Sequence, residues 1–358
     1  MPSQTSPVVR FTAPKVTDVV QADPLVAGPG FVRVRTLCSG ISADTDLTAF
    51  LGTNPYLHSR WDARQRLFLP GEPTFTYPIT GLGSAEVGEV TETGPGVTGP
   101  AVGERVWGSW GHRGDGLLPA EIASGQRLPS GADIRLGVFA GAGAVALNAV
   151  IEADIHVGET VAIFGQGVTG LLATRLAMLN GADVVAVDPA PERLGLATRF
   201  GAAEVVAARD VPAAERVREL TGGRGADVCI ELSGTYPALH EAVRTVCFSG
   251  RVVAAGFYEG GGAALRLGEE FRQNRVEIVG SQVSGVPPRY ANRWTRERLH
   301  RDFVRLAVTG RVDPLPLITH TVPVARVQQA FETLAAGQPA TLQVVLDFTT
   351  KSPAKSPR

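Results

Sequence analysis

The chain has 358 residues, of which 44% are hydrophobic and 19% charged, so its bulk has the composition of a folded globular protein rather than a disordered one. Thirty-four basic side chains stand against thirty-five acidic ones, and the net charge of -1 offers no positive surface for nucleic acid or an anionic membrane. The length predicts two domains or three.

The cysteines and the apolar stretches bear on the compartment. Cys38, Cys229 and Cys247 form neither a disulfide framework nor a CxxC pair. The N-terminal sequence lacks the basic segment and apolar run of a secretory signal. The longest apolar stretch, 160–179, is interrupted by glycines and Arg175, which predicts a strand and a helix rather than a membrane span. We therefore expect a cytoplasmic protein with no membrane partner.

Along the chain, the pattern of apolar and polar residues changes twice. Residues 1–141 carry short alternating runs, such as 31–36 and 86–92, between Gly- and Pro-rich turns, which predicts a mostly antiparallel β domain. In 142–284, six short apolar runs alternate with helical stretches, as in a parallel sheet covered by helices on both faces. Residues 285–358 add two predicted helices, a last strand and a polar tail, TTKSPAKSPR, which we expect to be disordered.

A glycine motif, GQGVTG, directly follows the predicted strand 161–164 and begins a helix. In this context Gly165 permits a tight turn, Gly167 lets a pyrophosphate approach the backbone, and Gly170 lets the helix pack against the strand. The helix N-terminus, beginning at Val168, offers N–H groups to a phosphate. The motif predicts a Rossmann domain, a doubly wound parallel six-stranded sheet that binds a dinucleotide.

Asp188 ends the next predicted strand, where a carboxylate accepts bonds from a ribose diol and repels the 2′-phosphate of NADP. Arg193 lies further on and would favour that phosphate, but the carboxylate is closer to the ribose in the usual geometry, so we predict NAD. The alternative is that Asp188 only caps the following turn. The later strand ends are predicted to face the same crevice and bind the ribose and nicotinamide, unless they are ordinary turns: Ser233, Gly256, Phe257, Ser281 and Gln282.

Further motifs extend over nearly the whole chain. Three segments correspond to motifs of the medium-chain dehydrogenase/reductase (alcohol dehydrogenase-like) superfamily. The first zinc motif of that superfamily corresponds to SGISADTD at 39–46. Its GHE-x-x-G-x-V segment corresponds to GLGSAEVGEV at 81–90, and its GDRV turn to VGERVWG at 102–108. The chain resembles that superfamily. More narrowly, GIS…TD, the histidine after GERVW and GSQV…RW resemble a zinc-free branch that includes bacteriochlorophyllide dehydrogenase relatives. The resemblance implies an α/β fold with a GroES-like β-rich catalytic domain, to which residues 285–358 return.

The positions of the family's zinc ligands carry other residues here. Ser42 aligns with the first ligand cysteine, and Ser84 with the histidine of GHE. Ala85 aligns with its glutamate and Ala140 with the remaining ligand cysteine. WGSWGHRGDG also lacks the cysteines of the structural zinc lobe. Catalytic zinc needs three ligands chosen from Cys, His and carboxylate, so we predict a protein without metal. Cys38 has strand parity and is expected to be a small buried side chain.

Without a metal, side chains must polarise the carbonyl and move a proton, while the nicotinamide carries the hydride. The resemblance places the loop that begins at Ser42 beside the nicotinamide ribose, with Thr45 as the proton-relay hydroxyl and Asp44 as a base. Asp46 resembles the family's buried aspartate, which holds this loop together. His112 follows the GERVW strand and is predicted as the general acid/base, with a hydrogen-bonded structural histidine as the alternative.

Other polar and aromatic side chains have structural interpretations. His240 falls in a predicted amphipathic helix, where a packing or surface role is expected. Tyr77 is an alternative phenolic proton donor. Trp107 and Trp110 would line a substrate pocket or belong to the core.

Together these features predict an NAD(H)-dependent, zinc-independent medium-chain alcohol dehydrogenase or ketoreductase. The expected substrate is a secondary alcohol or ketone of polyol, cyclitol, sugar-like or specialised-metabolite type. One alternative is a zinc-free enoyl or imine reductase, which usually takes NADPH; another is a non-catalytic nucleotide-binding protein. We also expect a homodimer built through the cofactor domains, because the predicted strand VEIVGS presents an exposed apolar sheet edge.

Overall fold

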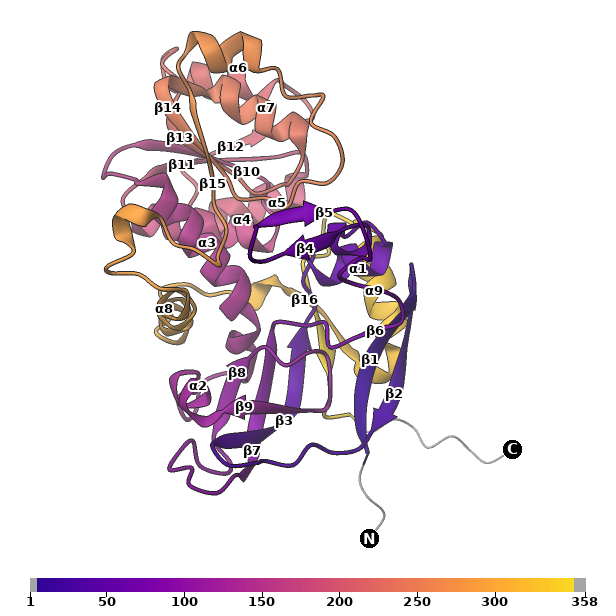
Figure 1. The fold of residues 1–358 in the computed structure, drawn as a ribbon. Coiled ribbons are helices and arrows are strands. Elements are labelled where there is room, and N and C mark those ends of the chain that lie inside the picture. Colours follow the sequence, from indigo (N-terminus) through magenta and orange to yellow (C-terminus); the bar gives the residue numbers. More distant parts are fainter. Residues whose placement is uncertain (1–4, 351–358) are drawn as a thin grey trace. The chain divides into compact units, whose positions relative to one another are not determined.

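The computed structural model describes residues 5–350, and these divide into two compact units (Figure 1). The first is formed by residues 5–140 and 315–350, and the second is Gly141–Pro314. From residue 351 onward, the polar tail that the sequence predicts to be disordered lies outside the described residues. Each unit has its own sheets and its own core.

The first unit is β-rich, as its alternating runs predict. Its largest sheet has the order β16-β17-β3-β7-β8, with β9 also paired to β3, and every pair except β16–β17 is antiparallel. A three-stranded sheet, β2-β1-β6, and a hairpin, β4-β5, complete it. The strands are β1 (Ser6–Ala13), β2 (Val16–Ala22), β3 (Phe31–Gly40), β4 (Arg60–Asp62), β5 (Leu67–Leu69), β6 (Ile79–Thr80), β7 (Glu86–Thr93), β8 (Arg105–Gly108), β9 (Asp115–Pro119), β16 (Ile318–Pro323) and β17 (Gln343–Asp347).

Short helices close the first unit. Phe331 on α9 packs against the rings of Phe11 and Phe50 at 5.1 and 5.2 Å between centroids, so the C-terminal segment shares a core with β1 and α1. The helical segments are α1 (Asp46–Leu51), η1 (Pro55–Leu57), α2 (Ala120–Gly125), η2 (Ile134–Phe139), η5 (Leu315–Leu317), η6 (Val324–Arg326) and α9 (Val327–Ala335).

The second unit is a parallel six-stranded sheet in the order β12-β11-β10-β13-β14-β15, which confirms the Rossmann prediction. All six predicted apolar runs form its strands. They are β10 (Thr160–Phe164), β11 (Asp183–Asp188), β12 (Glu204–Ala207), β13 (Ala226–Glu231), β14 (Val246–Ala254) and β15 (Glu277–Gly280). The helical segments are α3 (Ala140–Ala153), α4 (Val168–Leu179), α5 (Pro191–Arg199), α6 (Ala213–Leu220), α7 (Tyr236–Thr245), η3 (Leu267–Phe271), η4 (Pro288–Tyr290) and α8 (Arg296–Val308).

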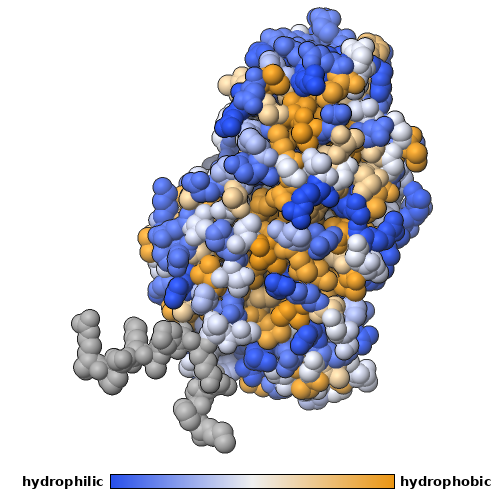
Figure 2. All heavy atoms as spheres, turned by 180° about the vertical axis from the view of Figure 1, so that it is seen from behind, coloured by the Kyte–Doolittle hydropathy of each residue, from blue (hydrophilic) through white to orange (hydrophobic). Residues whose placement is uncertain are grey.

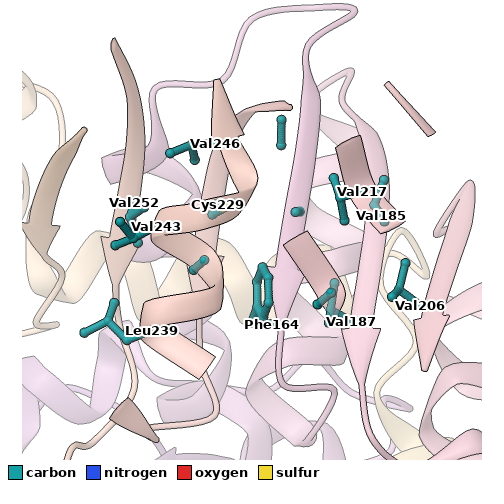
Figure 3. Close-up of a cluster of buried hydrophobic side chains, with 14 of the residues drawn as sticks. Phe164, Val185, Val187, Val206, Val217, Cys229, Leu239, Val243, Val246 and Val252 are labelled. Atoms are coloured by element: carbon teal, nitrogen blue, oxygen red, sulfur yellow. The ribbon is translucent and has the colours of Figure 1, made fainter. Parts of the chain in front are cut away.

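Alternate residues of these strands point to opposite faces of the sheet. On one face, Phe164, Val185 and Val187 pack with Val217 of α6 and Val243 of α7 (Figure 3). In the four inner strands the residues of opposite parity, such as Ile163, Ala186 and Ile230, are also fully buried, which explains why these strands are continuous apolar runs.

The boundary after this sheet differs from the prediction. Residues 285–314 were expected to return to the catalytic domain, but they belong to the second unit, and the return begins at Leu315. The reason is packing: a Cβ added to Gly143 would lie 2.1 Å from the ring of Phe303, so α8 rests directly against α3. Leu299 and Phe303 of α8 are fully buried.

One helical stretch, Ile134–Ala153, is long and apolar enough to cross a membrane by length and composition, but 67% of its most apolar 18-residue window is buried inside the protein, as in a core helix. On the face shown in Figure 2, hydrophobic side chains gather along the middle of the view, and hydrophilic side chains lie mostly toward its sides.

Candidate functional site

The glycine turn after β10 has the geometry that its motif predicts. Gly165 has φ +84°, and a Cβ there would lie 2.6 Å from the amide nitrogen of Ser233, so only glycine fits. A Cβ at Gly170 would lie 1.8 Å from the carbonyl oxygen of Gly165, which shows how closely α4 approaches the strand. Gly167 faces open space within 4 Å, which leaves room for a phosphate group at the backbone.

The N-terminus of α4 points its first amides into this space. The helix begins at Val168, with Gly167 as its N-cap and no side-chain capping bond. Gln166 is fully buried and its side chain holds the turn, because Nε2 donates to the carbonyl of Ile163 and Oε1 accepts from Thr174, both at 2.9 Å. Sequence reasoning missed this residue, because the motif treats its position as variable.

Asp188 is buried at the carboxyl end of β11. One carboxylate oxygen accepts from the amide of Gln166 at 2.7 Å and the other from the amide of Ala190 at 2.8 Å. The capping interpretation therefore holds, and the same bonds fix the carboxylate beside the glycine turn. Arg193 lies in the first turn of α5, where its amide donates to Ala190.

Glu231 organises the next two loops, and sequence reasoning did not single it out. It ends β13 fully buried, accepts from the amide of Ser233 at 2.7 Å, and also bonds the Ser233 hydroxyl and the phenol of Tyr258. Burial raises the pKa of Glu231, while these donors lower it. A Cβ at Gly256 would lie 2.4 Å from the amide nitrogen of Gly234, so the loops after β13 and β14 touch. The sequence signal that could have identified Glu231 was an acidic residue at the end of an apolar run.

The other predicted cofactor residues follow neighbouring strands. Phe257 follows β14 and is half-buried. Ser281 follows β15, where its hydroxyl accepts from Asn148 at 3.1 Å and its amide donates to Ala254. The Gln282 side chain accepts from the amide of Ser284 at 2.5 Å. Because all six strands are parallel, these residues, the glycine turn and Asp188 gather at one carboxyl edge, where such sheets bind ligands.

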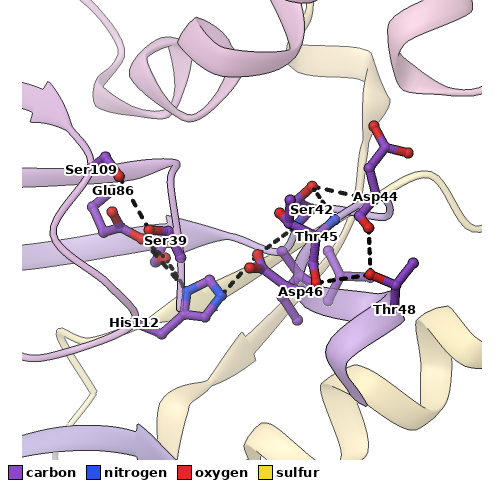
Figure 4. Close-up of polar contacts among 12 residues, drawn as sticks. Ser39, Ser42, Asp44, Thr45, Asp46, Thr48, Glu86, Ser109 and His112 are labelled. Atoms are coloured by element: carbon purple, nitrogen blue, oxygen red, sulfur yellow. Dashed lines mark hydrogen bonds and ion pairs between the residues drawn. The ribbon is translucent and has the colours of Figure 1, made fainter. Parts of the chain in front are cut away.

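In the first unit, a buried polar cluster surrounds His112 (Figure 4). Nε2 of His112 lies 3.1 Å from Asp46, and Nδ1 lies 2.5 Å from the hydroxyl of Ser39 and 3.7 Å from Glu86. Glu86 also accepts from Ser39 at 3.0 Å and from the amide of Trp110 at 2.8 Å. The side chains of His112, Asp46 and Glu86 are at most 1% exposed.

The neighbouring carboxyl groups shift the pKa of His112. Burial lowers the pKa of His112, but the charge and hydrogen bond of Asp46 and the charge of Glu86 raise it more, so the net shift is upward. Burial raises the pKa of Glu86, against the opposing effect of His112. The ring of His112 has no exposed surface, which favours the hydrogen-bonded structural histidine over the predicted general acid/base.

The loop before α1 stays accessible. Asp46 accepts from the amide of Ser42 at 2.8 Å, and the Ser42 hydroxyl accepts from the amides of Asp44 and Thr45, each at 3.3 Å. The side chains of Asp44 and Thr45 are exposed, and the carboxylate of Asp44 points away from His112 (Figure 4). Desolvation by the surrounding protein and the charge of Asp46 raise the pKa of Asp44. Asp46 thus holds the loop, as the resemblance implies.

The three aromatic side chains that the sequence offered for the site are engaged in the β unit. The phenol of Tyr77 donates to the carbonyl of Ala49, so this side chain supports α1 instead of offering a proton. Trp107 is buried, and the indole of Trp110 donates to Thr36 at 2.8 Å, so both belong to the fold of the β unit.

The segments that carry the zinc ligands in the superfamily meet in this unit. The amide of Gly40 donates to the carbonyl of Ala85 at 2.9 Å, and a Cβ at Gly40 would touch both Ala85 and Val138. The residues that these segments contribute are serine and alanine: Ser42, Ser84, Ala85 and Ala140. Alanine has no ligand atom, and a neutral serine hydroxyl is not a zinc ligand of the usual set, so these residues do not fit a catalytic zinc ion.

Comparison with known proteins agrees with this architecture. Residues 168–297 match the family described as zinc-binding dehydrogenase. D-guloside 3-dehydrogenase of Escherichia coli (strain K12) is 27% identical over 327 residues, which cover 89% of this chain and 93% of that protein. (R,R)-butanediol dehydrogenase of Bacillus subtilis (strain 168) is 28% identical over 289 residues, which cover 72% and 77%.

Solved structures share the fold. The butanediol dehydrogenase of Bacillus subtilis superposes with a TM-score of 0.76 at 21% identity, over 96% of this chain and 99% of that one. A protein of Sinorhizobium meliloti 1021, assigned as a zinc-binding dehydrogenase and bound to NADP, gives 0.76 at 22%, over 96% and 99%. The fold is that of the medium-chain dehydrogenases, a GroES-like β unit with a Rossmann unit. By sequence, the chain is similar to the zinc-binding dehydrogenase family over residues 168–297, and over most of its length to proteins named as guloside and butanediol dehydrogenases.

Proposed function

We propose that the protein is an NAD(H)-dependent, zinc-independent oxidoreductase that interconverts a secondary alcohol and a ketone. The observation that carries the cofactor assignment is the glycine turn with Asp188 held beside it by two backbone bonds. A carboxylate at this position accepts from a ribose diol and repels a 2′-phosphate, which favours NAD over NADP. The guloside, butanediol and sorbitol dehydrogenases among the relatives support a polyol or sugar-like substrate.

The bound dinucleotide supplies the hydride acceptor at C4 of its nicotinamide ring. The chain must then remove the hydroxyl proton of the alcohol. Asp44 is the accessible base. Its raised pKa makes it a stronger base than an ordinary aspartate and brings its pKa closer to neutral pH. Thr45 is the exposed hydroxyl that relays the proton, and Ser42 orients the loop by accepting both of their amides. His112 and Asp46 position this loop from behind.

Chelation tests the zinc assignment. After exhaustive treatment with a strong chelator, we expect NAD-dependent oxidation of secondary alcohols to continue within about twofold of the untreated rate. Bacillus subtilis butanediol dehydrogenase is a comparison enzyme for the same assay. Loss of turnover that zinc alone restores, in the wild type and in His240→Leu alike, would show that the catalytic unit uses a metal.

Substitution of the loop tests the proton path. Asp44→Asn is expected to lower kcat by about 10²–10⁴-fold with little change in NADH affinity, because general acid–base catalysis contributes that much. Asp23→Asn, which replaces an exposed aspartate elsewhere in the unit, is the matched control. Wild-type turnover in Asp44→Asn would remove this residue from the reaction.

Two other functions remain as alternatives. A zinc-free enoyl or imine reductase would prefer NADPH, which Asp188 disfavours. A non-catalytic nucleotide-binding protein would bind NADH without turning over any alcohol, so NADH fluorescence titration followed by a panel of polyols separates the two classes. We further propose a cytoplasmic homodimer, and the narrower resemblance to the zinc-free branch stays a prediction.

A further inference from the structure

One histidine of the second unit is buried without a hydrogen bond from the described residues to either nitrogen of its ring. His240 lies on α7 and is 5% exposed. Within the described part of the chain, neither Nδ1 nor Nε2 of its ring has a hydrogen-bond partner, although both atoms are buried. Buried polar atoms without partners are rare in native proteins because their lost hydration is not replaced. A ring nitrogen without a partner in a buried position is available to bind a ligand.

Two carboxylates face this ring. One ring nitrogen of His240 and one oxygen each of Glu269 and Glu270 lie within 4.8 Å of one another. Consecutive residues of a regular helix point about 100° apart, but the backbone of η3 leaves helical geometry at Glu269 (φ −96°, ψ −124°), and both side chains reach the histidine. Over residues 5–350, this is the one group of three His, Cys, Asp or Glu side chains close enough to hold a metal ion.

Glu270 has one oxygen engaged and one unused. Its Oε1 accepts from Arg244 at 3.3 Å, while Oε2 is buried and has no partner among the described residues. Arg244 lies four residues after His240, on the same face of α7. It also pairs with Glu241 at 2.6 Å and with Glu215 at 3.5 Å, so its charge is shared among three carboxylates.

Glu269 has a more readily released partner. It pairs with Arg266 at 2.8 Å, and both side chains are about half exposed, a setting in which an ion pair contributes little. Around the histidine, the carboxylates therefore outnumber the guanidinium groups. The remaining negative charge favours a cation.

We propose that His240, Glu269 and Glu270 bind a divalent first-row transition-metal ion, for which Zn²⁺ is the probe. Zn²⁺ accepts one imidazole nitrogen and two carboxylate oxygens, each at about 2.0–2.2 Å, with water as the fourth ligand. Mg²⁺ and Ca²⁺ prefer oxygen ligands alone. The ion joins α7 to η3 and so anchors the segment between β14 and β15. The site lies within the Rossmann unit and is separate from the positions that carry catalytic zinc in the superfamily.

Metal binding to the full-length, chelator-stripped protein tests the site directly. The expected result is one equivalent of Zn²⁺ in competition with a chromogenic chelator, and a visible absorption band when Co²⁺ is used. His240→Leu and Glu269→Gln are expected to weaken Zn²⁺ binding at least tenfold. The matched controls are His156→Gln and Glu219→Gln, which replace an exposed histidine and an exposed, arginine-paired glutamate of the same unit and are expected to bind as the wild type does.

Thermal unfolding gives an independent readout. His240→Leu removes both unpartnered nitrogens, so without metal its Tm is expected to equal or exceed that of the wild type. Zn²⁺ is expected to raise the Tm of the wild type and not that of the variant, by mass action. If His240→Leu fails to fold, the exposed Glu269→Gln carries the comparison.

The proposal is overturned if the wild type binds no Zn²⁺ below about 100 µM, if Mg²⁺ is bound equally well, or if both site variants retain wild-type affinity. None of these measurements depends on turnover, so they succeed or fail independently of the proposed oxidoreductase activity.

Discussion

At the scale of single residues, the carboxylate of Asp188 has a structural and a proposed binding role. Asp188→Ser is expected to weaken NAD(H) binding by about 1–3 kcal/mol, the value of a hydrogen bond whose partner is lost, and to raise the relative use of NADP. It is also expected to lower Tm, because the amides of Gln166 and Ala190 lose their acceptor. Fluorescence titration and thermal unfolding measure the two effects. Asp183→Ser, at the exposed start of the same strand, is the control; a wild type that already prefers NADPH would contradict the assignment.

A second residue-scale prediction concerns His112 and pH. Because its pKa is higher in the folded than in the unfolded state, its proton stabilises the fold. This stabilisation is complete below the unfolded pKa of about 6.5 and is lost as pH rises through the folded value. The raised pKa of Glu86 acts in the same direction. Urea titrations from pH 6 to 9 are therefore expected to show a free energy of unfolding that declines with pH.

The variant His112→Gln separates this contribution from the rest. It is expected to lose about 3–5 kcal/mol at pH 6, because it removes the imidazole that faces the buried carboxyl groups of Asp46 and Glu86, and to show a flatter pH dependence. The exposed His156→Gln is expected to follow the wild-type curve. Equal slopes for His112→Gln and the wild type would mean that His112 is not protonated in the fold.

The residue scale is also where sequence reasoning was least reliable. The structural need for Gly165 and Gly170 was identified correctly, because each answers a local backbone requirement. The partners of His112 were not identified, and Glu86 and Ser39 were overlooked, because these contacts join residues that lie 47 to 73 positions apart in the chain. Periodicity and spacing carry no information about such contacts.

At the scale of elements, the turn between β10 and α4 can be divided into a structural and a binding part. Gly170→Ala places a Cβ against the carbonyl of Gly165, and we expect it to cost about 1–3 kcal/mol of stability through overpacking. Gly167→Ala meets open space and has φ −72°, so its stability is expected to change by less than about 0.5 kcal/mol. Its added methyl group nevertheless occupies the phosphate position, and NADH affinity is expected to fall at least tenfold.

The two variants are compared by denaturant unfolding and by NADH titration. A Gly167→Ala protein that binds NADH normally would show that the phosphate does not approach this amide. Retained stability in Gly170→Ala would show that α4 can move away from β10.

All six strands of the parallel sheet were predicted from the sequence, because parallel strands covered by helices have short, nearly continuous apolar sequences. The unit to which α8 belongs was not predicted correctly. Its amphipathic pattern shows that one face is buried, but not which neighbour covers it. Contact with α3 through Gly143 and Phe303 placed it in the second unit.

At the scale of the whole molecule, the edges of the parallel sheet bear on assembly. Its two edge strands are β12 and β15. Strand β15 carries Ile278 and Val279, both half-buried. We predict that this apolar edge strand pairs with the same strand of a second copy in a homodimer. Light scattering at micromolar concentration is expected to give twice the mass of the chain.

Val279→Lys is expected to shift this equilibrium toward the monomer, because it places a charge at the pairing edge. Val205→Lys on β12 is the control, since it puts the same charge on the opposite edge at an exposed position. A monomeric wild type, or equal dissociation in both variants, would contradict assembly through β15.

The sequence by itself determined the two architectures, the nucleotide turn and the absence of zinc-binding side chains at the superfamily's ligand positions. Each of these is encoded in neighbouring residues or in a short period. Only the tertiary structure decided that His112 is enclosed by Asp46, Ser39 and Glu86, and that His240 meets two carboxylates from η3. The physical reason is that a buried polar group is defined by partners distant in sequence, and only the packed fold brings those partners within hydrogen-bonding distance.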